Sequence, residues 1–532
     1  MTVTDRYADT GHPKRWWTLI ILCLSLLVIS LDNTILNVAL PTLVTELSAS
    51  SSQLQWIVDS YVLVFAGLLL TAGALSDRFG RRLGLFAGFA IFAVASAFAA
   101  WSSSPDQLIA WRAVMGIGGA LIMPSTLSIL TNVFPAHERP KAIAIWAMTA
   151  GLGVPIGPVV GGWLLQHFWW GSVFLINIPI VAAALVAGIF LVPESKDPHA
   201  SPLDPGGALL SIAGLGTLIY AIIEAPSHGW TSIQTLVGFA VAAILLTAFV
   251  LWERRMEQPM LDMRLFRNMR FTGASIAISL VFFAMFGSLF SLTQYLQFVL
   301  GYDTLEAGIR VTPVALGIII GAGGSTRLAA HLGTKIIVSW GLAVVAGGLA
   351  LLSTVDSGSG YGLVATSLVI LGYGMGTAMA PATEAIMGAV PKDHAGVGSA
   401  VNDATRQVGG ALGVAILGSL LSTSYASSME DATANLPAPA ASAAGDSVGA
   451  AAQVAARLGG PEGAALISSA RTAFVDGMST SLLVAAGFAL TGALFAAIFL
   501  PSRAPKEDEM RDTHAEIGLV PQDRLTQETT GH

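Results

Sequence analysis

The sequence predicts an all-α membrane protein that crosses the bilayer fourteen times. Three observations support this fold class. Hydrophobic residues make up 54% of the 532 residues and charged residues 11%, with a mean hydropathy of +0.70, whereas a soluble domain carries about 25% charged residues. Apolar blocks recur between short polar breaks, and each block has about 20 residues, the helix length that a bilayer core requires. Lys and Arg gather in alternate breaks, as the positive-inside rule predicts.

The fourteen expected spans are 16–38, 54–75, 83–101, 107–131, 141–164, 172–192, 208–224, 233–252, 271–297, 308–328, 335–353, 362–389, 398–421 and 478–500. With the N-terminus inside, 21 of the 26 Lys and Arg lie in inner segments, two lie in an outer loop, and three lie within or beside spans. A miscounted span would disturb this asymmetry, so we expect both termini in the cytoplasm. The first block is too long for a signal-peptide core, and we expect it to remain as a span.

An internal repeat divides the chain into two halves. At an offset of 256 residues, Gly116, Gly118, Pro135, Gly153, Gly157 and Gly162 recur as Gly372, Gly374, Pro391, Gly409, Gly413 and Gly418. Duplicated halves around a central site are a common plan of secondary transporters. The expected organisation is an N-terminal tail at 1–15, a six-helix half at 16–192, two inserted helices with cytoplasmic flanks at 193–270, a second six-helix half at 271–500, and a disordered tail at 501–532.

The outer segment 423–477 is rich in Ala, Gly and Ser and is too long for a simple turn. It therefore predicts a short helical hairpin outside the membrane. We assign no chemistry to this segment.

Several kinds of chemistry have no motif in the sequence. It contains no Gly-x-x-x-x-Gly-Lys-Ser/Thr phosphate loop, no zinc-type histidine spacing and no grouped nucleophile and base. The single cysteine, Cys23, cannot form an intramolecular disulfide. We expect no cofactor, no metal and no enzymatic activity. The expected partners are small-molecule substrates and the lipid bilayer, without nucleic acid, and the protein is expected to be a monomer driven by a proton gradient.

Six ionisable side chains are expected within spans: the acids Asp32, Asp59, Glu384 and Asp403, and the bases Arg112 and Arg406. A charge at the centre of a span costs about 2.5 to 3.5 kcal/mol on insertion scales, so each is a functional candidate. If all six line one cavity, burial makes reversible protonation of a carboxylate feasible near neutral pH. The excess of acids over bases favours a cationic substrate.

Two spans carry a continuous face of candidate binding residues. On the thirteenth span the polar face consists of Ser399, Asn402, Asp403, Arg406, Gln407 and Gly410. A polar face of this kind cannot contact lipid, and its Asp403 and Arg406 either bind substrate or neutralise each other as an ion pair. The ninth span carries Phe283, Phe286, Phe290, Gln294 and Gln297 along one side. This side either stacks on a cation or is a packing stripe.

Four stretches resemble the motifs of the major facilitator superfamily. The loop after the second span reads GALSDRFGRR at 73–82, the fourth span WRAVMGIGGALIMPS at 111–125, and the fifth span GLGVPIGPVVGG at 151–162. The first span contains LDNTILNVALP at 31–41, which resembles a motif of the fourteen-helix drug:proton antiporters. The resemblance extends from about residue 16 to 500. It implies the major facilitator fold, with two six-helix halves and two inserted helices.

The residues and the resemblance together give four groups of candidate site residues. Proton coupling is expected of Asp32, Arg112 and Asp59. Substrate binding is expected of Asp32, Asp59, Glu384, Asp403, Asn402, Arg406, Phe290 and Gln294. A conformational latch between the halves is expected of Gly73, Asp77, Arg78, Gly80 and Arg81. The antiporter motif consists of Gly153, Pro155, Gly157, Pro158, Gly161 and Gly162.

Each group has a structural alternative and a physical rationale. Asp32 and Arg112 can each belong to a purely structural contact, and the loop at 73–82 can be a static inner anchor. Asp77 lies at the C-terminal end of a helix, where the dipole disfavours its charge, so it needs a partner. The glycines of the fifth span let helices approach closely, and its prolines interrupt the hydrogen-bond ladder. Some members of the family carry two adjacent acids on the thirteenth span, where this chain has Asn402 before Asp403.

We therefore expect a proton-driven antiporter of the bacterial cytoplasmic membrane. It would export amphipathic, cationic drugs or antibiotics by alternating access. The alternative is a dedicated exporter of one endogenous product, such as an antibiotic, lipid or metabolite, which would carry the same motifs.

Overall fold

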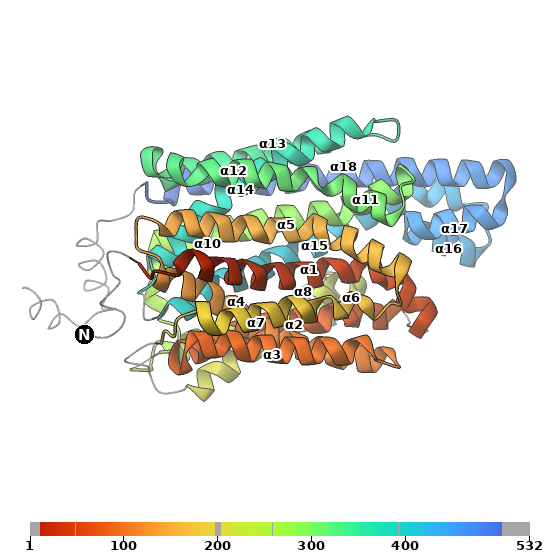
Figure 1. The fold of residues 1–532 in the computed structure, drawn as a ribbon. Coiled ribbons are helices and arrows are strands. Elements are labelled where there is room, and N and C mark those ends of the chain that lie inside the picture. Colours follow the sequence, from red (N-terminus) through yellow and green to blue (C-terminus); the bar gives the residue numbers. More distant parts are fainter. Residues whose placement is uncertain are drawn as a thin grey trace, which may run out of the picture.

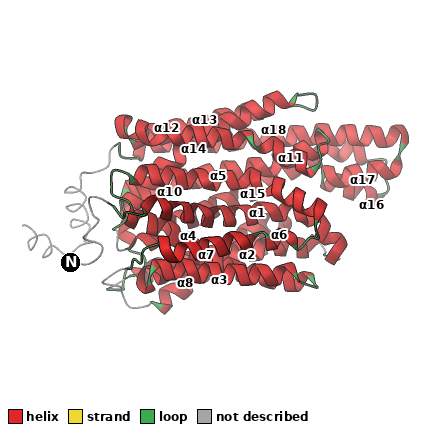
Figure 2. Ribbon diagram, in the orientation of Figure 1, coloured by secondary structure: helices red, strands yellow, loops and turns green. Residues whose placement is uncertain are grey.

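The computed structural model describes residues 11–47, 49, 51–196, 204–257, 259–391 and 394–502. Most of the N-terminal tail, and of the C-terminal tail expected to be disordered, lies outside these ranges. The described residues form an elongated bundle of roughly antiparallel helices, with loops and no strand (Figures 1 and 2).

The first part of the chain forms α1 (Arg15–Leu47), α2 (Ser51–Phe79), α3 (Arg81–Ala100), α4 (Pro105–Val133), α5 (Arg139–His167), α6 (Ser172–Leu175) and α7 (Asn177–Leu191). Two helices follow, α8 (Pro205–His228) and α9 (Ile233–Glu253). The last part forms η2 (Met263–Arg267), α10 (Met269–Gln294), η3 (Tyr295–Val299), α11 (Thr304–Val311), α12 (Pro313–Leu332), α13 (Thr334–Leu352), α14 (Tyr361–Gly388), α15 (Ala395–Thr433), α16 (Ala438–Asp446), α17 (Val448–Leu458) and α18 (Gly460–Phe499).

The apolar helices agree with the predicted membrane class. Thirteen segments of the described residues are long and apolar enough to cross a membrane, and α5, with 29 residues, lies at the place of the remaining expected span. Two expected spans are interrupted: 172–192 is divided into α6 and α7, and 308–328 is divided before Pro313, whose ring removes a backbone donor.

The outer segment differs from the expected boundaries. Helices α15 and α18 have 39 and 40 residues, which at 1.5 Å per residue is about 60 Å, roughly twice the thickness of a bilayer core. Both extend past the expected spans, and α16 and α17 pack between their ends (Figure 1). The expected short hairpin is therefore a larger helical projection.

Packing groups the helices into two bundles. We call α1 to α7 the N bundle and α10 to α18 the C bundle. Helix α15 contacts α2 and α4, and α5 contacts α11, α12 and α14, so these pairs join the two bundles. The inserted helix α8 packs on both α2 and α15 and therefore touches both bundles.

The sequence repeat has a counterpart in the packing. An alanine at Gly153 would place its Cβ against Ser30 of α1, and one at Gly409 would place it against the carbonyl of Ser279 on α10. These two glycines are related by the 256-residue offset. The repeat thus places a glycine at the corresponding close helix contact of each bundle.

Candidate functional site

The bundle has two ends. At one end, which we call the terminal face, His12 hydrogen-bonds to the end of α4 and Ser502 to the start of α13. At the other end, which we call the loop face, lie α16 and α17 (Figure 1).

Asp32 and Arg112 form a buried ion pair inside the N bundle. Arg112 Nη1 on α4 lies 2.5 Å from Asp32 Oδ2 on α1, and the two side chains are 1% and 0% exposed. The guanidinium also donates from Nε to the carbonyl of Ile57 at 3.1 Å, and its Cζ lies 4.4 Å from the centre of the Tyr61 ring. Because three groups hold the arginine, it does not depend on Asp32 alone for its place.

The other oxygen of Asp32 is held by Asn177, the first residue of α7. Asn177 Nδ2 donates to Asp32 Oδ1 at 2.9 Å and to Ser96 Oγ at 3.1 Å. Ser96 Oγ in turn donates to the carbonyl of Phe174 at 2.8 Å. Sequence reasoning did not find Asn177, because it is an uncharged residue within the expected span 172–192, and only the fold shows that it reaches Asp32.

Asp59 lies on the same side of α2 as Trp56, close to the inserted helix α8. It is half-buried, accepts a hydrogen bond from Gln55 and interacts electrostatically with Glu224 of α8. Trp56 stacks on Tyr220 of α8 at 6.1 Å between ring centres. Among the described residues, no Lys, Arg or His lies within 4.0 Å of the Asp59 carboxylate.

Glu224 in turn pairs with His228, with Nδ1 and Oε2 3.1 Å apart. Glu224 is the last residue of the expected span 208–224 but was not among the candidate acids, and only the fold shows that this second carboxylate lies beside Asp59.

Asp403 and Arg406 lie on α15 where the two bundles meet. Arg406 does not pair with Asp403 within 4.0 Å in the described structure. Its Nη2 donates to Thr383 Oγ1 at 3.2 Å, and its Cζ lies 4.8 Å from the ring of Trp146 on α5 and 5.2 Å from that of Phe282 on α10. The guanidinium is thus held between one aromatic ring from each bundle. In this arrangement Asp403 and Arg406 do not form the direct, self-neutralising ion pair that was the structural alternative.

Asn402 is fully buried beside Asp403 and donates from Nδ2 to Asp403 Oδ1 at 3.3 Å. The polar face expected on the thirteenth span is therefore buried between helices rather than exposed to lipid.

Glu384 lies in a different environment from the one predicted. Its Oε2 is 3.1 Å from Nη2 of Arg270, and its side chain is 26% exposed. Arg270 is the second residue of α10 and was counted outside the spans. The expectation that four acids face two bases is therefore wrong for Glu384, because the fold supplies it with a third base.

Phe290 and Gln294 lie on the outside of the polar region. Phe290 is 42% exposed, and its ring packs 3.3 Å from where a Cβ on Gly418 would lie. Gln294 Nε2 donates to the carbonyl of Phe290 at 3.4 Å. The phenylalanine therefore covers a glycine of α15, which is the packing alternative for this side of α10.

The loop at 73–82 reaches across to the C bundle. The Asp77 carboxylate, 5% exposed, accepts the backbone N–H of Gly396 at 2.8 and 3.0 Å and that of Val397 at 3.2 Å. These are the first N–H groups of α15, where the helix dipole favours an anion. Arg81 Nε donates to Asp77 Oδ1 at 2.7 Å. Asp77 thereby gains the partners that its position at the end of α2 requires.

The remaining latch residues surround this contact. An alanine at Gly73 would place its Cβ 2.6 Å from the carbonyl of Gly396, so α2 and α15 touch at this point. Gly80 has φ +123°, a conformation that favours glycine, and a Cβ there would meet Glu194 at 2.5 Å. Arg78 lies over the ring of Phe79, with its Cζ 5.7 Å from the ring centre.

The glycines of the fifth span face two partners. Gly157 and Gly161 contact α1 at Thr34 and Ile35, next to the contact of Gly153. Pro158 and Gly162 instead face α11 of the C bundle, where Gly308 and Leu305 approach them.

A Cβ on Gly308 would lie 2.5 Å from Pro158 Cβ. The side chain of Pro155 lies outside the described residues. This motif therefore packs α5 against both bundles at once.

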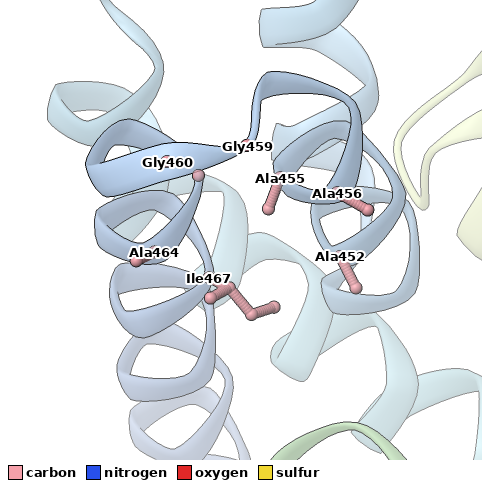
Figure 3. A pocket seen from close by; sticks show the side chains of 8 residues that line it. Ala452, Ala455, Ala456, Gly459, Gly460, Ala464 and Ile467 are labelled. Atoms are coloured by element: carbon pink, nitrogen blue, oxygen red, sulfur yellow. The ribbon is translucent and has the colours of Figure 1, made fainter.

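The predicted site residues are distributed over several places. The Asp32–Arg112 pair lies within the N bundle, Asp59 faces α8, Arg406 lies between the bundles, and Glu384 pairs with Arg270 in the C bundle. They therefore do not form one cluster in the described conformation. A groove of about 270 Å³ opens elsewhere, between α17 and α18 of the outer projection (Figure 3). Its lining is Ala452, Ala455, Ala456, Gly459, Gly460, Gly463, Ala464 and Ile467, without a charged side chain.

Comparison with known proteins places the chain among transporters. The family model described as Major Facilitator Superfamily matches residues 22–414. The multidrug efflux pump LfrA of Mycolicibacterium smegmatis is 38% identical over 91% of this chain and 96% of its own length. The tetracenomycin C resistance and export protein of Streptomyces glaucescens is 34% identical over 94% and 93% of the two chains. The methyl viologen resistance protein SmvA of Salmonella typhimurium is 34% identical over 88% and 95%.

Solved structures agree on the fold. The human organic anion transporter MFSD10 superposes with a TM-score of 0.61 over 91% of this chain and 100% of its own, at 14% identity. A bacterial homologue of the lysosomal transporter Spinster gives a TM-score of 0.57 over 92% and 99% of the two chains, at 19% identity.

Proposed function

Because this chain belongs to the major facilitator superfamily, we propose that it exports amphipathic, cationic drugs or antibiotics across the bacterial cytoplasmic membrane in exchange for protons. The observation that carries the proposal is the Asp32–Arg112 pair, a carboxylate with no exposure bound to a permanently charged base. A buried pair of this kind is a weak source of stability, whereas a carboxylate that alternates between an arginine and a proton can couple proton movement to a conformational change.

The exchange uses the proton gradient, without a cofactor. Each proton that moves inward across 100 mV releases about 2.3 kcal/mol before any pH difference is added. In the proposed cycle, a proton from outside neutralises Asp32 and weakens its attraction to Arg112. Asp59 and Asp403, which have no base within 4.0 Å in the described residues, supply negative charge for a cation.

Alternating access requires the contact between the bundles to open and close. We propose that the terminal face is cytoplasmic and that Asp77 closes it by binding the start of α15. An opening of this contact would expose Asp403 and Arg406 to the cytoplasm, where drug would enter. The protein would act as a monomer in the bilayer.

The names of the relatives support export of toxic compounds. They include a multidrug efflux pump, an antibiotic export protein and a methyl viologen resistance protein. Because a protein dedicated to one antibiotic also stands among these relatives, export of a single endogenous product is the second candidate.

Proton flux in proteoliposomes tests both. A panel that includes methyl viologen and tetracenomycin C is presented to the purified protein, and internal pH is followed with a dye. We expect drug-driven proton movement in the wild type and in Asp106→Asn, and none in Asp32→Asn. Asp106 serves as the control because it is an aspartate that accepts a hydrogen bond from Gln53, away from the candidate site. Full exchange in Asp32→Asn would remove Asp32 from the coupling mechanism. A response to a single compound would favour the dedicated exporter.

A further inference from the structure

Asn177 is bound to Asp32 through a chain of hydrogen bonds with a fixed direction. The carbonyl of Phe174 can only accept, so Ser96 Oγ donates to it. The Ser96 oxygen is then free to accept from Asn177 Nδ2, which also donates to Asp32 Oδ1. Both hydrogens of the Asn177 amide are thereby used, and both Asn177 and Ser96 are 0% exposed.

The same amide leaves its oxygen without a partner. Asn177 Oδ1 is buried and accepts no hydrogen bond in the described structure. An unsatisfied buried acceptor destabilises the fold, so a fold that tolerates one needs a reason for it. The reverse orientation would place the amide oxygen against an ionised carboxylate, which repels it. The observed orientation is therefore the one that a charged Asp32 selects.

We propose that Asn177 is a positioning residue that responds to the protonation of Asp32 by turning over its amide. When Asp32 takes a proton from the outside, its carboxyl becomes a hydrogen-bond donor and no longer needs one from Asn177. A half-turn about the terminal torsion of Asn177, which is soft and two-fold, brings Oδ1 to the place of Nδ2. The amide oxygen then accepts the new O–H, and it accepts the Ser96 hydroxyl when that rotates away from Phe174.

The balance of the step is simple. One proton is transferred from a hydronium ion outside to Asp32 Oδ1. An O–H bond of the hydronium breaks and leaves water, an O–H bond forms at Asp32, and no other covalent bond changes. Arg112 loses an ionised partner and keeps the Ile57 carbonyl and the Tyr61 ring. The unpartnered oxygen seen in the charged state is the acceptor that the protonated state uses.

The charged and polar groups around Asp32 determine which interactions influence its protonation. Arg112 faces it from α4, and Tyr61 of α2 interacts with it electrostatically. Asn177 of α7 donates to it, and Ser96 of α3 contacts Asn177; both residues are uncharged. Helix α5 faces this part of α1 with glycines. Arg112 and Tyr61 stay unchanged in the variants below, so a shift in the pH response reports on the amide.

Asn177→Leu, which keeps the shape and removes the hydrogen bonds, is the main variant. A hydrogen bond to a charged group is stronger than one to a neutral group, and the difference corresponds to about one pH unit in the midpoint of protonation. We expect Asp32 to take its proton at a pH about one unit higher in this variant, seen as the midpoint of its carboxylic acid band in infrared difference spectra. The Asp32→Asn variant, which lacks that band, identifies it.

Serine variants provide a matched pair. Ser96→Ala removes the second acceptor of the amide, and we expect a smaller upward shift. Ser25→Ala is the control, because Ser25 is equally buried and its hydroxyl donates to the carbonyl of Ile21 within its own helix. We expect no shift in this variant. Ser96→Ala also keeps the inference testable if Asn177→Leu does not fold.

The turn of the amide has its own signal. In protein labelled with isotope-enriched asparagine, the band that disappears in Asn177→Leu should shift on acidification with the same midpoint as the Asp32 band. A band that stays fixed while Asp32 titrates, or an unchanged midpoint in both Asn177→Leu and Ser96→Ala, would overturn this inference alone. The inference rests on the proposed function, and full proton exchange in Asp32→Asn would overturn both.

Discussion

Replacing Asp77 by asparagine should open the contact between the two bundles at the terminal face. The carboxylate accepts the first N–H groups of α15 from Gly396 and Val397 and a hydrogen bond from Arg81. Hydrogen bonds to a charged group contribute about 1.5 to 3 kcal/mol each, and the amide keeps one acceptor oxygen. We therefore expect the closed state to lose about 2 to 4 kcal/mol of stability relative to the open state. This lowers the closed-to-open ratio by a factor of about 30 to 700.

Spin labels can measure this shift. Leu83 on α3 and Ile336 on α13 are 56% and 53% exposed at the terminal face, one on each bundle. Cysteines at these two positions, in a protein whose Cys23 is replaced by serine, allow pulsed dipolar spectroscopy. Asp77→Asn should add a population at longer distance, whereas Asp106→Asn should not. Identical distance distributions in all three proteins would refute the reasoning that Asp77 holds the bundles together.

Two further predictions concern stability. Gly157→Ala should lower the apparent Tm, with a loss of about 1 to 3 kcal/mol in stability, because the new Cβ overlaps Thr34 on α1. Gly347→Ala should match or exceed the wild type, because a Cβ there meets no atom within 4 Å other than its own helix backbone and chain neighbours. The hydrogen bond from Arg15 lowers the pKa of Glu138 below its usual 4.5. Because a lowered pKa stabilises the fold only above that range, the Tm difference between wild type and Glu138→Gln should be constant near neutral pH and vanish on acidification through the lowered value. A difference that persists in acid would contradict this.

The fold class could be predicted because it depends on composition and periodicity. In a bilayer the backbone N–H and C=O groups of a span can form hydrogen bonds only within the helix. The length of an apolar segment is therefore enough to predict a membrane span. The charge asymmetry and the repeat then constrained their number. The family match and the solved structures confirm the fold class. The lengths of α15 and α18 were not predicted. Beyond the expected spans the sequence becomes more polar but still favours a helix, so the change in composition does not mark the helix end.

Individual residues of the candidate site could be predicted from the sequence, but the pairs that they form could not. Asp32 and Arg112 are each conspicuous as charges within spans, yet their partnership depends on how α1 and α4 pack. Glu384 illustrates the limit: its base, Arg270, lies at a helix end that composition assigns to the water. The roles of these residues in transport stay predictions.

By itself, the sequence determined that the chain is a bundle of membrane helices, approximately where those helices lie along the chain, and which charged residues lie within them. Only the tertiary structure decided which partner each charge receives. It placed Asp77 on the N-terminus of a helix more than 300 residues away and supplied Asn177 to Asp32. The physical reason is that the apolar pattern of a single segment indicates whether that segment lies in the membrane. A hydrogen bond between two segments depends on how both are positioned in the fold, which no local pattern specifies.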